Sequence, residues 1–184
     1  DKLVKLGVVT EEEAAHIDPV IRFNIKQDAL YRHELMMLDL IGTNRFERDI
    51  YTMNPGYIRN PFPLVDQFCI EDGMVFKLIP YPAQQQFTDG TADYFLKGTK
   101  QDDGSYDALE WGNLDRDIYV DPISQNMGNV QRQTFVLLAR SLMGRGDTAT
   151  ARALVDMGDR FFPKKNFAHD KYCLSMIEVY NALY

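Results

Sequence analysis

The stretch MGRGDTATARALV, residues 143–155, decides how the C-terminal third of the chain folds. It separates two segments in which apolar residues recur at helical spacing, so it is typical of the turn in a helical hairpin. Gly144 and Gly146 can take the left-handed conformation that ends a helix, and Asp147 stands where the N-cap of the next helix belongs. Arg145-Gly146-Asp147 is also a tripeptide that adhesion receptors read on exposed loops, but the turn explains each of its residues without a receptor.

Three helices are expected from residue 126 onward, over 127–144, 147–162 and 167–183. Their connections are short, so consecutive helices should lie antiparallel.

Small residues stand where the first two of these helices would cross. Ala139, Ala151 and Gly158 let two helix axes approach closely, and Pro163 follows the end of the second helix. This pattern resembles the tetratricopeptide repeat, in which large and small residues alternate on a helical hairpin. The third helix would pack like the next repeat or like a capping helix.

The front of the chain mixes helix and strand signals. Apolar residues at helical spacing predict a helix over 29–44 with Gly42 as its stop, and Thr10 followed by Glu13 has the pattern of a capping box. The segments RDIYTMN (48–54) and MVFKLIPY (74–81) indicate strands, whereas PLVDQFCIEDG (63–73) suggests a short helix.

The predicted fold class is therefore α+β, with a mixed front half packed on the helical hairpin plus one further helix. We expect an α+β region over 1–125, with a loose, Gly- and Asp-rich loop over 82–125, and a tetratricopeptide-like region over 126–184.

Composition excludes several classes of function. The 184 residues carry a net charge of −7, which argues against nucleic acid or an anionic membrane surface as partner. No window approaches about 20 unbroken apolar residues, so no membrane span is expected. The chain opens on Asp1 with no signal peptide, and we interpret it as a mature fragment or a cut-out domain. Cys69 and Cys173 stand among apolar neighbours, which is typical of buried thiols, and the sequence leaves open whether they pair.

Catalytic and metal-binding signatures are missing from the sequence. His16, His33 and His169 belong to no metal pattern, and no nucleophile elbow, phosphate-binding loop or dinucleotide-binding glycine pattern is present. We therefore expect no catalytic residue, no metal ion and no cofactor.

Two sets of residues remain as candidates for binding. Exposed positions on the first helix of the hairpin would line a groove for a polypeptide or partner protein, because helical hairpins commonly bind peptides between successive helices. The groove residues are Asn129, Arg132, Gln133 and Arg140. The second set consists of aromatic residues of the loose loop that could stack on a sugar or fill the gap between the two halves of the chain: Tyr94, Tyr106 and Trp111.

Three segments of the chain together resemble a known family. They are HELMMLDLIGTNRFERDIYT (33–52), FCIEDGMVFKLIPY (68–81) and WGNLDRDIYVDP (111–122), followed by the helical hairpin. This order is similar to the C-terminal soluble portion of a bacterial membrane-protein family of unknown function, which is related to the protein O-mannosyltransferases. The matched residues are Leu38, Asp39, Asn44, Arg48, Ile50, Tyr51, Gly73, Phe76, Leu78, Pro80, Trp111, Gly112, Asn113, Asp115 and Tyr119. Phe46 stands where the family usually has Trp, and Asp49 replaces a proline.

The resemblance implies a parent protein whose multi-spanning N-terminal part carries the transferase chemistry. This fragment would then lie on the periplasmic or extracytoplasmic side of the membrane, and no catalytic acid carries over to it. We expect a non-catalytic accessory domain that binds a polypeptide acceptor or partner. The alternatives are a carbohydrate-binding module around Tyr94 and Trp111, and a free-standing enzyme with a cleft of convergent titratable groups.

Overall fold

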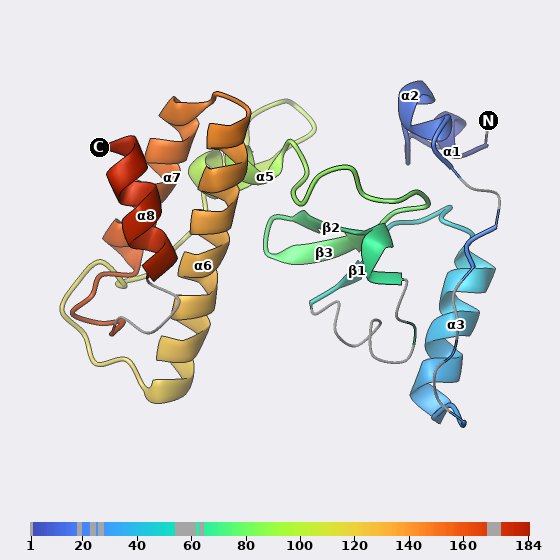
Figure 1. Ribbon diagram of the computed structural model, residues 1–184, viewed down its shortest axis with the longest axis horizontal. Coiled ribbons are helices and arrows are strands. Elements are labelled where there is room, and N and C mark those ends of the chain that lie inside the picture. The colour runs from blue at the N-terminus through green and yellow to red at the C-terminus, as the bar shows by residue number, and fades with distance from the viewer. Residues whose placement is uncertain are drawn as a thin grey trace. The chain divides into compact units, whose positions relative to one another are not determined.

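The computed structural model describes residues 2–17, 20–22, 25, 28–53, 62, 65–168 and 174–184. Contacts divide the chain into two compact units, Asp1–Asp89 and Gly90–Tyr184 (Figure 1). The α+β class predicted from the sequence is confirmed. Residues 90–125, which are expected in the α+β front region, belong instead to the same compact unit as the helices that follow them.

The first unit combines short helices with a small antiparallel sheet. Its elements are α1 (Lys2–Lys5), α2 (Glu11–Ala14), α3 (Arg32–Asn44), β1 (Ile50–Thr52), the 3-10 helix η1 (Val65–Phe68), β2 (Cys69–Asp72) and β3 (Val75–Leu78). The strand order is β1-β3-β2, so Leu78 of the central strand pairs with Ile50 on one side and with Cys69 on the other. The capping box predicted at Thr10 and Glu13 is present and begins α2.

The core of this unit lies around the buried side chains of Phe62, Phe68 and Leu78. Leu38 and Ile41 of α3 pack against it, as helical spacing predicts, whereas Leu35 is exposed. Gly42 does not stop the helix.

Helix α3 ends with a polar side chain, that of Asn44, and with two residues in the left-handed backbone conformation. The helix continues to Asn44, and Arg45 and Phe46 follow with positive φ angles of 52° and 58°. The Asn44 side chain then accepts a hydrogen bond from the Arg48 backbone at 3.1 Å, which turns the chain toward β1.

The helix expected over 63–73 is wrong for most of its length. Among its described residues, 65–73, only η1 is helical, and the residues after it form β2, with Ile70 buried and paired in the sheet. Gly73, at φ 65°, begins the two-residue turn between β2 and β3. Asp72 and Gly73 therefore close a strand rather than a helix.

The second unit is mainly helical. Its elements are α5 (Thr91–Lys97), β4 (Thr99–Lys100), β5 (Tyr106–Asp107), α6 (Pro122–Gly144), α7 (Thr148–Phe161) and α8 (Leu174–Leu183). The two short strands pair with each other, and α6 and α7 run antiparallel beside each other (Figure 1). The predicted loose loop thus contains a helix whose Phe95 is buried.

The caps of the hairpin helices follow from side-chain chemistry. Helix α6 begins earlier than predicted because Asp121 accepts the backbone N–H groups of Ile123 and Ser124 at 3.0 and 3.2 Å, with Pro122 in the first turn. Asp147 caps α7 as predicted and accepts the Thr150 N–H at 3.1 Å. Of the two glycines in the turn, only Gly146 is left-handed, at φ 84°, and Gly144 remains helical.

The small residues of the hairpin are buried, as the sequence predicts. Ala139 and Ala151 are fully buried, and a Cβ added at Gly158 would lie 3.1 Å from Cδ2 of Phe135. The close approach of α6 and α7 therefore depends on them. The likeness to a tetratricopeptide repeat stays a prediction.

The last helix begins later than expected. Phe167 is buried and lies outside any helix, and α8 is described over Leu174–Leu183. Cys173 and His169 lie outside the described residues, so the pairing of Cys69 with Cys173 stays open. None of the described helices is both long enough and apolar enough to cross a bilayer.

Candidate functional site

The residues predicted to line a polypeptide groove have different environments. Arg140 is exposed and forms an ion pair with Glu178 of α8, while Asn129 and Gln133 are half-buried. Arg132 is only 2% exposed, so its prediction as an exposed position is wrong. The four residues thus do not share one exposed surface, and their role in binding a partner stays a prediction.

Arg132 holds the segment that follows α7. Its guanidinium donates to the backbone carbonyls of Phe162 and Phe167, the latter at 3.2 Å, and to the side-chain oxygen of Asn129 at 3.1 Å. A buried arginine is stable only when it is hydrogen-bonded in this way. Helical spacing alone places a polar residue here but does not show that its side chain turns inward.

Asn166 is a second buried polar residue, and no sequence pattern points to it. It is 4% exposed and donates to the carbonyl oxygens of Leu114 and Arg116 at 2.8 and 2.5 Å. Its own oxygen accepts the Ile118 N–H at 3.4 Å. The segment 111–119, which carries the WGNLDRDIY motif, is therefore fastened to the segment between α7 and α8.

The aromatic residues predicted to stack on a sugar do not lie together in one site either. Tyr94 packs edge-on against Phe95 with ring centroids 5.4 Å apart. The Tyr106 hydroxyl donates to Asp93 at 3.3 Å, and Lys97 lies 5.4 Å above the Tyr106 ring. Neither tyrosine lines the pocket described below.

Trp111 belongs to an aromatic cluster inside the second unit. It stacks on Phe161 at 5.3 Å and meets Phe135 and Phe162 at steep angles, with centroids 6.0 and 5.7 Å away. Phe95 approaches Phe135 at 4.8 Å. Aromatic pairs in these geometries stabilise a core beyond their buried area, so Trp111 joins its segment to both helices of the hairpin.

A pocket of about 390 Å³ opens beside this cluster, and we call it the α5–α7 pocket. It is lined from α5, from the segment after β5 and from the second half of α7. The lining residues are Phe95, Leu96, Lys97, Ala108, Leu109, Trp111, Ala153, Asp156, Met157, Arg160 and Phe161. Of the three predicted sugar-stacking residues, the pocket contains only Trp111, and the carbohydrate role of the set stays a prediction.

Charged groups of the pocket are partly engaged with neighbours. Lys97 pairs with Asp93 at 2.9 Å, and this contact lowers the pKa of the Asp93 carboxyl. Asp156 accepts a hydrogen bond from the Tyr184 hydroxyl, which raises the pKa of that tyrosine. Arg160 lies 5.1 Å from the Phe161 ring and forms no ion pair with any residue that the structure describes.

A row of exposed apolar side chains runs along the first half of α6. Ile123, Met127 and Val130 are 76%, 67% and 59% exposed, and their spacing of four and three residues places them on one face of the helix. No charged residue occurs over 122–131. We call these three residues the α6 apolar row.

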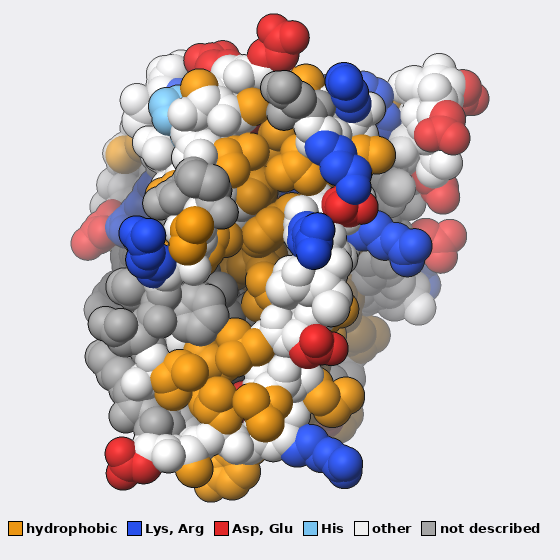
Figure 2. Space-filling model, turned by 90° about the vertical axis from the view of Figure 1, so that its right-hand side faces the viewer, with side chains coloured by type: hydrophobic (Ala, Val, Ile, Leu, Met, Phe, Trp, Pro, Cys, Tyr) orange, Lys and Arg blue, Asp and Glu red, His pale blue; other side chains and the backbone are white. Residues whose placement is uncertain are grey.

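Helix α3 of the first unit exposes apolar side chains too, but among charges. Leu35, Met36 and Leu40 are more than half exposed, and the charged residues Arg32 and Asp39 of the same helix are exposed as well. Figure 2 views the side on which α3 lies and shows apolar side chains gathered between charged ones. The α6 apolar row differs from this face because residues 122–131 around it carry no charged side chain.

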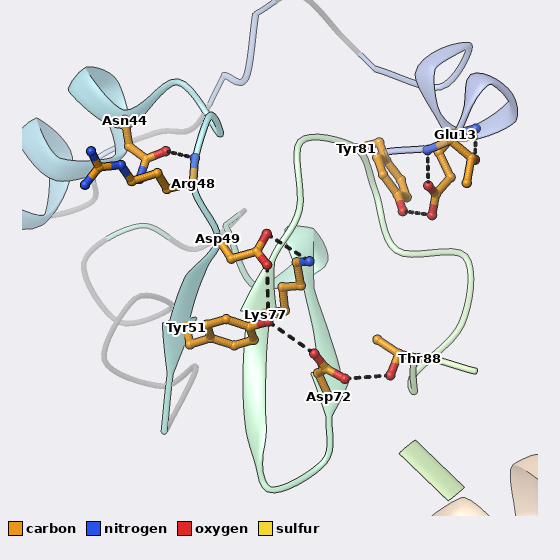
Figure 3. A network of polar contacts seen from close by, with 10 residues as sticks. Glu13, Asn44, Arg48, Asp49, Tyr51, Asp72, Lys77, Tyr81 and Thr88 are labelled. Atoms are coloured by element: carbon orange, nitrogen blue, oxygen red, sulfur yellow. Dashed lines mark hydrogen bonds and ion pairs between the residues drawn. The ribbon is translucent and has the colours of Figure 1, made fainter. Parts of the chain in front are cut away.

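A polar network joins the strands of the first unit (Figure 3). The Tyr51 hydroxyl lies 3.4 Å from both Asp49 and Asp72, Lys77 pairs with Asp49 at 2.9 Å, and Thr88 donates to Asp72 at 2.9 Å. Burial and the two carboxylates raise the pKa of Tyr51 to about 12, so its hydroxyl keeps its proton at neutral pH. The network thus links β1, β2 and β3, and the protonated Tyr51 hydroxyl does not serve as a general base near neutrality.

The structure offers no metal centre within its described residues, where His, Cys, Asp and Glu do not cluster in threes. The family model described as TMEM260-associated domain 2 matches residues 1–95, which is 95 of the 184 residues. Comparison with curated proteins and with solved structures yields no match. The match covers the whole first unit and the beginning of the second, and the chain therefore belongs to the family of the TMEM260-associated domain 2.

Proposed function

We propose that the chain is a non-catalytic accessory domain of a membrane protein related to TMEM260, and that it binds a polypeptide, either an acceptor or a partner subunit. The family match supports the association with such a protein. The resemblance of the chain to the C-terminal portion of O-mannosyltransferase-related proteins supports a position on the extracytoplasmic side of the membrane.

The observation that carries polypeptide binding is the α6 apolar row. Three large apolar side chains at helical spacing, each more than half exposed, leave apolar surface in water at a free-energy cost. Exposed apolar surface of this kind is typical of protein–protein contacts. An amphipathic partner helix can bind such a row with apolar side chains that have the same spacing.

Charge supports this assignment of the row. In a chain of net charge −7, residues 122–131 carry no charged side chain, so a partner can cover them without desolvating an ion. Gly128 and Arg132, on the inner side of the same helix, are buried. The helix is therefore held in place by its inner face, and its outer face is available for a partner.

A photo-crosslinking experiment tests the proposal. A photoreactive side chain is placed at Met127 of the parent protein in its own membrane, and at Ala149 as an exposed control on α7. We expect one polypeptide adduct at position 127, identified by mass spectrometry, that is missing at position 149. The substitution Val130→Asp should suppress the adduct, because it places a charge in the row. Equal labelling at both positions, or an adduct that Val130→Asp leaves unchanged, would contradict the proposal.

A further inference from the structure

The α5–α7 pocket has the form of a site for one apolar group. Its volume of about 390 Å³ lies within the range of about 300–1,000 Å³ that is typical of ligand pockets. Most of its lining is aromatic or aliphatic, and it includes the face formed by Trp111 and Phe161. Ala153 contributes only a methyl group, which leaves room between the larger side chains.

The charges at the pocket favour a ligand with one negative group. Lys97, Asp156 and Arg160 are the ionised side chains of the lining, and together they carry a net charge of +1. Lys97 is engaged by Asp93, whereas Arg160 pairs with no carboxylate in the described part of the chain. An arginine can accept a carboxylate through two parallel hydrogen bonds. Arg160 is thus the group most available to an anion.

A sugar ring fits this lining less well. Each of its hydroxyl groups needs a hydrogen-bond partner when it leaves water, since an unpaired polar group is costly to bury. The lining contains no Asn, Gln, Ser, Thr or His side chain. Of its charged groups, Lys97 and Asp156 already have partners.

We propose that the α5–α7 pocket binds an apolar side chain of a polypeptide that carries a carboxylate next to it, either a C-terminal carboxylate or an adjoining acidic residue. The apolar group packs against Trp111, Met157 and Leu109, and the carboxylate pairs with Arg160. The inference rests on the proposed function in taking the ligand to be a polypeptide, but it concerns a surface that does not include the α6 apolar row.

Trp111 gives a direct measurement of occupancy, because it is the single tryptophan of the chain and lines the pocket. The probes are N-acetylphenylalanine, which has the apolar ring and a carboxylate, and N-acetylphenylalaninamide, which lacks the charge. We expect a saturable change of Trp111 emission with the acid. The amide should bind more weakly, by up to about fivefold, which is the upper end of what an exposed ion pair contributes.

Two pairs of variants test the assignment of residues. Ala153→Leu fills the pocket and should abolish the response, whereas Ala149→Leu, an exposed alanine of α7 outside the lining, should retain it. Arg160→Gln should remove the preference for the acid over the amide. Arg145→Gln, an exposed arginine of the turn before α7, should keep that preference.

Several results would overturn the inference. These are no saturable response to either probe, an equal response of Ala153→Leu and wild type, or saturation by a soluble glucose oligosaccharide without any response to the acid. The outcome is separate from that of the crosslinking test. If no adduct forms at position 127 without the Val130→Asp substitution but Trp111 responds to the acid, the role of the α6 apolar row alone is refuted. If the adduct forms but Trp111 does not respond, the pocket alone is refuted.

Discussion

Replacing Gly128 by alanine tests the packing that orders the second unit. Gly128 lies on the buried face of α6, and a Cβ built there would come within 2.2 and 2.4 Å of Cε1 and Cδ1 of Phe167, and within 3.1 Å of Cδ1 of Phe162. Phe167 is 2% exposed and packs edge-on against Phe162 at 5.2 Å. The ring therefore has no open space into which it can withdraw.

Two opposing effects set the change in the free energy of unfolding that Gly128→Ala causes. Alanine gains up to about 1 kcal/mol over glycine within a helix. Carbon atoms in contact prefer about 3.5–4.0 Å, so the new Cβ overlaps Phe167 by more than about 1 Å, and overpacking of a core typically costs about 1–3 kcal/mol or more. The clash exceeds the helix gain, and we expect Gly128→Ala to lower the free energy of unfolding by about 1–2 kcal/mol.

Urea unfolding followed by Trp111 emission measures this change, because Trp111 packs against Phe162 in the same cluster. The expected loss lowers the urea midpoint by roughly 0.5–1 M for a domain of this size. Gly144→Ala is the matched control, since Gly144 belongs to the same helix and no atom lies within 4 Å of its added Cβ. That variant should be neutral or slightly stabilised. If Gly128→Ala were as stable as Gly144→Ala, the packing of Phe167 on α6 would be refuted.

Four further outcomes follow from particular contacts. Arg132→Met should cost about 2–4 kcal/mol in urea unfolding of the second unit, because two buried backbone carbonyls lose a charged donor; an unchanged midpoint would show that the guanidinium contributes nothing. Asn166→Ala should speed hydrogen exchange of the Ile118 amide by on the order of tenfold while α7 amides keep their protection, and uniform acceleration would instead indicate global destabilisation. Gly42→Ala, with no atom within 4 Å of the new Cβ, should stabilise the first unit by about 0.5–1 kcal/mol as measured by circular dichroism, and a loss of stability would place a neighbour against α3. Folding raises the pKa of Tyr51 from 10.0 to about 12, so the stability that its protonated form contributes is present below pH 10 and is lost as the pH rises to 12. The variant Tyr51→Phe should therefore lose less stability than the wild type over this interval. Identical pH profiles of the two proteins would argue against the network of Figure 3.

Local chemistry made much of the fold predictable. The caps at Thr10 and Asp147 and the strand over Val75–Leu78 depend on residues close in sequence, and each forms as predicted. The helix expected over 63–73 is a different case: a short apolar run is compatible with both helix and strand, and pairing with β3 makes Cys69–Asp72 a strand.

The candidate site was less predictable. The positions of Asn129 and Arg140 on a helix followed from periodicity, but periodicity did not show that Arg132 turns inward to Phe162 and Phe167. Arg160 and Asp156 stand one turn apart on α7, which places them on one face of that helix. That this face meets α5 and Trp111 in a pocket depends on packing between segments more than 40 residues apart.

The sequence by itself determined the caps that begin α2 and α7, which small residues allow α6 and α7 to touch, and that no known catalytic pattern is present. These properties depend on neighbouring residues, on helical period and on residue chemistry. Only the tertiary structure decided which polar side chains are buried, that Trp111 joins the core cluster beside a pocket, and that Ile123, Met127 and Val130 remain exposed. The physical reason is that the packing of distant segments decides which side chains are buried. An apolar helical face can equally well pack into the core or bind a partner.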